Sequence, residues 1–257
     1  MLIEKDTLLS ENFEVADKLN EFFIESVDKL NIEPFLGDQN NFVSIGNLND
    51  MISKYSNHPS IVKIKENINQ NNRFYFSNIT PPDIEKEILR LDPKKANISG
   101  DIPSKMIIIS HDIVSNHLSY VYNKAKDSHS FPKSLKKADV IPIHKKEEKT
   151  LAKNYRPVSL IPIVSKVFEK QMYGEIMNYI EKFLSPYLFG FRKYHSTEQC
   201  LTIMLEYWKK SLDKKGYSGA ILTDLSKAFD CLNHDLLVSK SHAYGFSNDA
   251  LNFFTAI

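Results

Sequence analysis

Apolar side chains recur at helical spacing along much of this 257-residue chain. Between residues 11 and 31 they fall three or four positions apart, which predicts an amphipathic helix. Ser196 followed by Gln199 is a capping-box pattern, which indicates a helix start at that point. The same periodicity predicts a helix that begins at residue 80 and further helices over 104–126, 164–183, 197–214, 235–244 and 247–257.

Strand patterns are fewer than helix patterns. Residues 73–79 are typical of a strand, and the short runs 138–143 and 155–160 predict a hairpin with a lysine-rich loop. The apolar run that leads to Asp224 predicts a buried strand over 218–224. We expect this strand to pack against the helices 164–183 and 197–214, with one edge unpaired or covered by a helix. The expected fold class is therefore α/β (α+β) and rich in helix.

A polar, asparagine-rich stretch separates the first helix from the rest. Residues 33–72 contain glycine and proline punctuation, which is typical of a linker with one or two short helices. We therefore divide the chain into a helical N-terminal segment and linker, 1–72, and a main domain, 73–257.

The formal net charge of +1 conceals two segments of opposite sign. Residues 1–31 contain eight acidic residues against three lysines, and residues 133–156 contain eight basic residues against three acidic ones. The two cysteines, Cys200 and Cys231, have no paired spacing, which argues against a disulfide scaffold or a structural zinc site. No signal peptide or bilayer-spanning apolar run is evident. We expect an intracellular protein with no membrane partner, and the sequence does not distinguish nucleus from cytoplasm.

Two groups of residues are candidates for chemistry. Asp224, at the end of the predicted strand, is placed either to hold a divalent cation or to cap the next helix. Phe229 and Asp230 follow within one or two helical turns. In the basic segment, Lys145 and Arg156 suit a phosphate clamp, although most lysine-rich loops are simply solvated.

Several segments, in this order, resemble the reverse transcriptase domain of non-LTR (LINE-type, jockey-like) retrotransposons. The element Lys95–Pro103 resembles an early motif of that family, and the resemblance covers roughly residues 75–257. Each motif alone is weak, but the ordered set is specific. The matching segments are Phe131-Pro132 with Val140–Lys146, Asn154–Leu160 with Ser165–Lys170, Phe189–Arg192 with His195–Thr197, and Leu222–Asp230.

The resemblance implies the fingers and partial palm of a right-hand polymerase. Its activity would be RNA-directed DNA synthesis by two-metal nucleotidyl transfer, with Mg²⁺, an RNA template, a DNA primer and deoxynucleoside triphosphates. Asp224 would be the catalytic carboxylate that bridges both metals, assisted by the Leu225 backbone carbonyl. Phe229 would lie under the incoming sugar, and Arg156 with Lys145 would hold the triphosphate. The resemblance assigns Asp230 no catalytic role.

The sequence also departs from the family pattern. Leu188 stands where the family usually has glutamine, and the family has a glycine near Tyr194. No aromatic-x-Asp-Asp sequence occurs in the 257 residues, so we expect a domain truncated before that motif and inactive as this chain alone.

Three alternatives remain beside this interpretation. The first is a repurposed, non-catalytic nucleic-acid-binding or interaction protein derived from a reverse transcriptase. The second is a phosphotransferase with Asp224 as nucleophile, although Leu225 and Ser226 follow where an Asp-x-Asp or threonine loop is expected. The third is a structural α/β domain without catalytic function.

Overall fold

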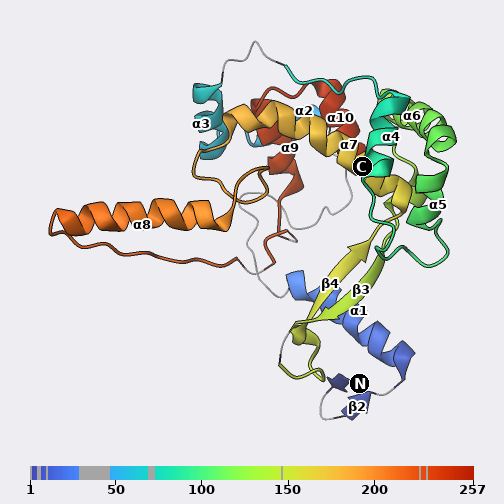
Figure 1. The fold of residues 1–257 in the computed structure, drawn as a ribbon, viewed down its shortest axis with the longest axis horizontal. Coiled ribbons are helices and arrows are strands. Elements are labelled where there is room, and N and C mark those ends of the chain that lie inside the picture. Colours follow the sequence, from blue (N-terminus) through green and yellow to red (C-terminus); the bar gives the residue numbers. More distant parts are fainter. Residues whose placement is uncertain are drawn as a thin grey trace.

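The computed structural model describes residues 2–4, 7–9, 11–28, 47–68, 73–145, 147–225, 227–229 and 231–257, and helices predominate among them (Figure 1). The α-helices are α1 (Asn12–Asp28), α2 (Leu48–Lys54), α3 (Pro59–Asn67), α4 (Pro81–Leu89), α5 (Ser104–Ile109), α6 (His111–Asp127), α7 (Ile163–Ile180), α8 (Thr197–Asp213), α9 (His234–Ala243) and α10 (Asn248–Ala256). Short 3-10 helices are η1 (Lys133–Lys136), η2 (Ala152–Asn154) and η3 (Glu181–Phe183), and the strands are β1 (Leu2–Glu4), β2 (Thr7–Leu9), β3 (Asp139–His144) and β4 (Tyr155–Leu160).

The helix predictions are confirmed within the described residues apart from one break, and residues 29–31 of the first predicted helix lie outside those residues. Helix α4 begins at a capping box in which Thr80 and Asp83 exchange hydrogen bonds, and α8 begins at the predicted capping box of Ser196 and Gln199. The single helix predicted over 104–126 is wrong, because α5 and α6 meet at Ser110. There the backbone leaves helical geometry (φ −100°, ψ 21°), and the Ser110 hydroxyl donates to the Met106 carbonyl at 2.9 Å.

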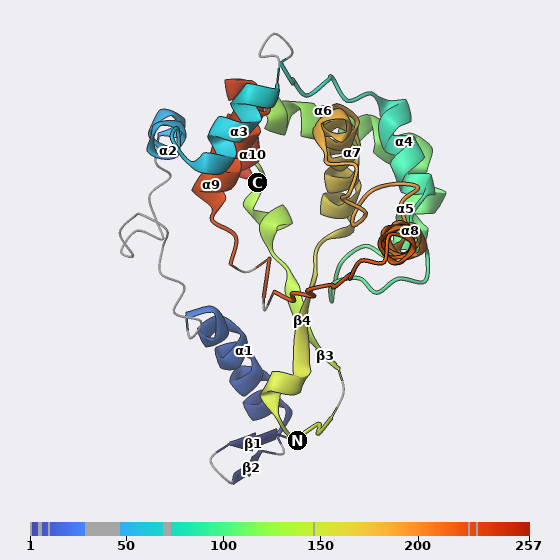
Figure 2. The same ribbon diagram turned by 90° about the vertical axis from the view of Figure 1, so that its left-hand side faces the viewer.

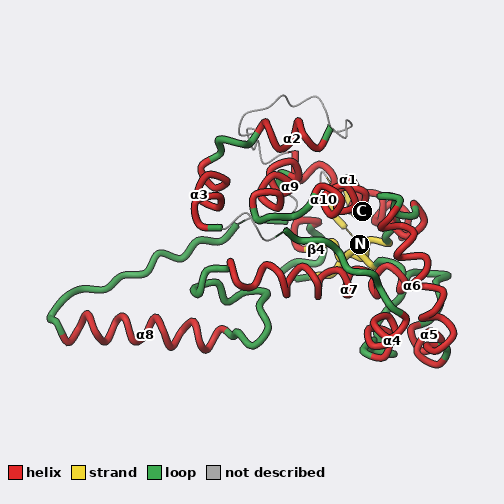
Figure 3. The backbone as a smooth tube through the Cα atoms, turned by 90° about the horizontal axis from the view of Figure 1, so that it is seen from above, coloured by secondary structure: helices red, strands yellow, loops and turns green. Residues whose placement is uncertain are grey.

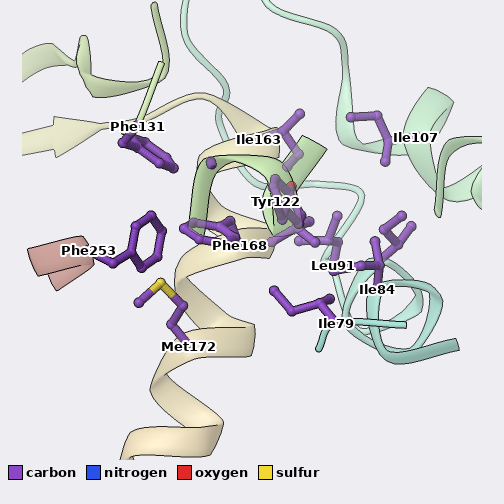
Figure 4. Packing of buried hydrophobic residues seen from close by; sticks show 13 residues of the cluster. Ile79, Ile84, Leu91, Ile107, Tyr122, Phe131, Ile163, Phe168, Met172 and Phe253 are labelled. Carbon is purple, nitrogen blue, oxygen red and sulfur yellow. The ribbon is translucent and has the colours of Figure 1, made fainter. Parts of the chain in front are cut away.

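The main hydrophobic core lies where α4, α6 and α7 meet (Figure 4). Phe168 is at its centre, with its ring centroid 4.5 Å from Tyr122 and 5.3 Å from Phe131. Phe253 reaches this core from α10, 5.8 Å from Phe168. The Tyr122 hydroxyl donates to the Val164 carbonyl at 2.7 Å, and burial raises the pKa of this phenol. Satisfying that buried hydroxyl ties α6 to the first turn of α7.

A second group of helices packs around α9. Helices α2 and α3 both contact α9, and the Ser239 hydroxyl on α9 donates to the Met51 carbonyl at 2.8 Å. The polar stretch between residues 33 and 72 therefore holds two short helices in its described part, as predicted. The division of the chain at residue 72 stays a prediction.

The strand predicted over 73–79 is wrong. Phe74 is buried and Tyr75 is exposed. In place of a ladder, the segment makes one isolated bridge to Phe246, with hydrogen bonds from Phe74 N to Gly245 O (2.8 Å) and from Ser247 N to Phe74 O (3.0 Å). The aromatic side chains are thus fixed by ring packing, since Phe74 lies 4.5 Å from Phe246 between ring centroids.

The strand predicted over 218–224 is also wrong. Helix α8 projects from the body, and residues 216–225 run back along it without helix or strand structure (Figures 1 and 3). Ile221 and Leu222 are more than 90% exposed, so the predicted packing against α7 and α8 is absent. A strand is stabilised by its cross-strand neighbours. Among the described residues, the sheets are the separate two-stranded pairs β1–β2 and β3–β4, and neither supplies a neighbour here.

Candidate nucleotide and nucleic-acid site

The predicted hairpin is confirmed as the antiparallel pair β3–β4, which projects from the body (Figure 2). Its register places Pro142 opposite Pro157 and Ile143 opposite Arg156. Opposed residues alternate between hydrogen-bonded and non-hydrogen-bonded pairs, and proline has no N–H to donate. The prolines therefore suit a non-hydrogen-bonded pair, where the missing N–H groups would point outward from two edge strands. The bond from Lys145 N to Asn154 O (2.8 Å) continues the same alternation beyond β3.

This register brings two predicted site residues together. Arg156 is opposite Ile143, and Lys145 lies two positions beyond Ile143 on the neighbouring strand. Side chains two positions apart lie on the same face of a strand, so Lys145 and Arg156 are diagonal neighbours on one face, about 7–8 Å apart at the backbone. Both side chains are exposed, and the aliphatic residues Ile141, Ile143 and Val158 on the same face are between 39% and 49% exposed. The result is an open surface with aliphatic and cationic parts.

The lysine-rich loop at the hairpin tip is ordered by bonds from side chains to the backbone. Asn154 is buried and donates from Nδ2 to the Glu148 carbonyl at 2.9 Å. The Tyr155 hydroxyl donates to the Lys149 carbonyl at 2.7 Å. These bonds order the loop through the side chains of Asn154 and Tyr155. The Lys149 and Lys153 side chains take no part in them and are exposed. Lys146 lies outside the described residues.

Loop 94–103, which resembles the early family motif, fixes the base of the hairpin. Asp139, the first residue of β3, accepts a hydrogen bond from Ser99 N at 3.2 Å. Asp101 accepts from Ile163 N, the first residue of α7, at 2.9 Å. Sequence reasoning did not single out Asp101 or Asp139, because local spacing does not show that their backbone partners are 62 and 40 residues away.

After η3 the chain makes a turn rich in aromatic and basic residues, Phe189–Lys193, and Arg192 holds this turn. This guanidinium donates to Glu181 Oε1 at 2.6 and 3.0 Å and to the Ser185 and Leu188 carbonyls at 3.0 and 3.1 Å. The hydrogen bond from Arg192 lowers the pKa of the Glu181 carboxyl. Tyr194 has φ 63°, in the region that favours glycine, and this is the part of the sequence where the family has a glycine. Arg192 therefore closes the turn and is not free to bind phosphate.

The structure leaves Asp224 and Phe229 apart from the hairpin cations. Asp224 and Leu225 lie in the exposed segment 216–225. Phe229 packs edge-on against Phe191, with 6.1 Å between ring centroids and an interplanar angle of 86°. Within the described chain, no hydrogen bond, ion pair or ring contact joins Asp224 to Lys145, Arg156 or Phe229. Asp230, which the family pattern includes, is outside the described residues.

A divalent cation needs several oxygen ligands, and Mg²⁺ prefers six in octahedral geometry. Across the described ranges, no group of three or more His, Cys, Asp or Glu side chains comes together in a way that could hold a metal ion. The described residues therefore do not by themselves fit the two-metal site that the resemblance implies. No described helix is both long and apolar enough to cross a membrane.

Comparison with known protein families assigns the part of the chain that contains Arg156, Arg192 and Asp224 to one family. Residues 143–255 match the family described as "Reverse transcriptase (RNA-dependent DNA polymerase)". This segment belongs to the reverse transcriptase family. It includes Arg156, the Arg192 turn and Asp224, whereas most of β3 and loop 94–103 precede it.

Several curated proteins that are similar to this chain are polymerases of mobile elements. The chain is 28% identical over 169 residues to "RNA-directed DNA polymerase from mobile element jockey" of Drosophila melanogaster, which covers 65% of this chain and 18% of the relative. It is 33% identical over 128 residues to "Probable RNA-directed DNA polymerase from transposon BS" of the same organism, which covers 48% and 14%. It is 28% identical over 166 residues to the jockey protein of Drosophila funebris, which covers 63% and 18%. The matched part of the chain thus spans less than a fifth of the length of each of these relatives.

Proposed function

We propose that this chain is part of an RNA-directed DNA polymerase of a non-LTR retrotransposon and contributes its fingers and the first part of its palm. The complete domain would join a primer 3′-hydroxyl to a deoxynucleoside triphosphate opposite an RNA template. The observation that carries the proposal is the arrangement of Lys145 and Arg156 as diagonal neighbours on one exposed face of the hairpin. The family match over 143–255 supports it.

Arg156 and Lys145 are the proposed triphosphate ligands. The planar guanidinium of Arg156 can donate two parallel hydrogen bonds to a phosphate, and Lys145 adds a compact charge beside it. Phosphoryl transfer requires mainly positioning and charge neutralisation from the protein. The exposed aliphatic side chains on the same face of β3 and β4 offer a surface for the less polar parts of a nucleotide or of a nucleic-acid strand.

Asp224 is the proposed catalytic metal ligand, with the Leu225 carbonyl beside it and Phe229 under the incoming sugar as a gate against a 2′-hydroxyl. Mg²⁺ ions, when bound, would neutralise charge on the transferring phosphate. Since the described residues do not assemble a metal site, we propose that further ligands come from other parts of the complete domain. Residues 218–224 would also have to gain strand neighbours there.

A second candidate function is nucleic-acid binding without catalysis, in a protein derived from a reverse transcriptase. It is favoured by one contrast in the structure. The hairpin is fully formed and its cations share a face, whereas the Asp224 segment is exposed and not joined to the hairpin. Nucleic-acid binding without catalysis requires the hairpin cations and does not require Asp224.

Binding to an RNA–DNA primer–template, measured by fluorescence anisotropy at several salt concentrations, tests both functions. We expect weak binding that falls as salt rises, because each phosphate contact releases counterions. Replacing Lys145 and Arg156 with alanine should reduce the salt slope by about one per lost contact, or about two in total.

The matched control is Lys105→Ala with Lys124→Ala, which removes two exposed cations from α5 and α6. It should change the slope much less than the hairpin double variant. Binding that is the same in the hairpin double variant and in the unaltered chain would show that these residues belong to a solvated loop, and would refute the proposed function.

A further inference from the structure

Helix α1 lies beside the distal half of the hairpin, at its cationic tip. It contacts η2, which contains Lys153, and both views show it alongside this part of the hairpin (Figures 1 and 2). Leu19, on the inward face of α1, is 4% exposed. On the same face, the Phe22 ring lies under the Lys227 ammonium, 5.7 Å from the ring centroid. Lys227 stands between Asp224 and Phe229, so α1 contacts both the hairpin tip and the other proposed nucleotide-binding segment.

The outward face of α1 is acidic. Residues 11–28 contain six acidic residues and one lysine. Four exposed acids recur at three- and four-residue spacing, which aligns them in a single stripe along the helix. These are Glu14, Asp17, Glu21 and Glu25, and we refer to them as the acidic stripe. These acids lie on the side of α1 opposite the buried Leu19, so the width of the helix separates them from the hairpin tip. Lys18 pairs with one of them, Glu21, at 3.0 Å. The stripe has the charge sign and rough linearity of a phosphate backbone.

We propose that α1 is an intramolecular competitor of nucleic acid, which lowers the affinity of the hairpin for RNA while it is docked. The inference rests on the proposed function, since it requires that the hairpin bind phosphate. Exposed charges interact through water over roughly the Debye length of about 8 Å at physiological salt. At about 0.01 M salt this length rises to about 30 Å, which exceeds the ~10–12 Å width of a helix. Because α1 contacts η2, its stripe therefore acts on the tip lysines across the helix at low salt. RNA must then either displace α1 or bind the hairpin in the presence of the negative electrostatic potential of the acidic stripe.

The test measures the affinity of the 257-residue chain for a labelled single-stranded RNA by fluorescence anisotropy. The stripe variant combines Glu14→Gln, Asp17→Asn, Glu21→Gln and Glu25→Gln. We expect it to bind about fivefold more tightly than the unaltered chain at low salt, because each screened charge at ~10 Å contributes a few tenths of RT or more. The gain should shrink as salt rises.

The matched control removes the same amount of charge from helices at the far end of the body, α2, α3 and α6. It combines Asp50→Asn, Glu66→Gln, Asp112→Asn and Asp127→Asn. We expect a change of less than about twofold, because these helices lie at the opposite end of the molecule from the tip (Figure 2) and the interaction between charges falls with distance. A gain equal to that of the stripe variant would show an effect of total charge and would overturn the proposal.

A third variant, Leu19→Asn, keeps every charge and weakens the docking of α1 through its most buried described side chain. This variant should also bind RNA more tightly than the unaltered chain. Limited proteolysis shows whether α1 is undocked, because an undocked helix is cleaved faster. An unchanged RNA affinity in a variant whose α1 is cleaved faster would refute competition. The hairpin double variant separates the two proposals. If it binds RNA as well as the unaltered chain, the proposed function fails. If it weakens binding while the stripe variant gains nothing, the inference about α1 alone fails.

Discussion

Asp101 links the loop at the base of the hairpin to the first turn of α7, and its removal should measurably destabilise the protein. One carboxylate oxygen accepts from Ile102 N and the other from Ile163 N, both at 2.9 Å. Ile163 is 2% exposed, so its N–H cannot easily turn to water when Asp101 is replaced by alanine, whereas Ile102 is 54% exposed. Losing a carboxylate at a helix N-terminus costs about 0.5–2 kcal/mol, and a buried unsatisfied donor costs about 1–3 kcal/mol. We therefore expect Asp101→Ala to lower the free energy of unfolding by about 2 kcal/mol.

Urea unfolding followed by circular dichroism measures this change. With an m-value of about 2 kcal/mol/M, the midpoint of Asp101→Ala should fall by about 1 M. Asp101→Asn keeps one acceptor oxygen and should lose about half as much. Asp92 accepts from Lys94 N at 2.9 Å in an exposed turn, so Asp92→Ala is a control that should change the midpoint little. Equal midpoints for Asp101→Ala and Asp92→Ala would refute the reasoning.

Three further outcomes are expected. Tyr194→Gly should stabilise the protein by about 0.5–1 kcal/mol in the same urea assay, because a left-handed backbone costs a non-glycine residue about 1–2 kcal/mol. Tyr187 does not have a positive φ, so the control Tyr187→Gly should not stabilise the protein. Because Arg192 lowers the pKa of Glu181, this pair stabilises the fold above the unfolded carboxyl pKa of about 4.3 and loses its effect as pH falls through the lowered value. Glu181→Gln should therefore destabilise at pH 7 and become neutral in acid, and a difference that persists in acid would contradict the pairing. In primer-extension assays with Mg²⁺ or Mn²⁺, the purified chain should extend no primer, and extension that disappears in Asp224→Ala would reveal a metal ligand that we have missed.

The helices and the hairpin could be predicted from sequence because their signals are local. An apolar period, the Ser196 capping box and the two short alternating runs each specify structure within a few residues. The same pairing of β3 with β4 puts Lys145 and Arg156 on one face, so this half of the candidate site follows once the register is known.

The parts that sequence reasoning missed depend on distant partners. The run before Asp224 has the composition of a buried strand, yet it is exposed because no described strand pairs with it. The contact of Phe229 with Phe191 and the docking of α1 join segments far apart in the chain, and no short-range pattern indicates either. Ser110 is a milder case, since a serine inside an apolar period does not by itself announce a break.

The opposed prolines of the hairpin have a consequence for how its loop can change in evolution. If β4 slipped by one residue along β3, Pro157 would enter a position where the ladder requires an N–H, and a hydrogen bond would be lost. The same slip would turn every side chain of β4 to the opposite face and separate Arg156 from Lys145. Insertions and deletions between the strands can therefore lengthen or shorten the tip, because the prolines oppose the one-residue slip that would put the two cations on opposite faces.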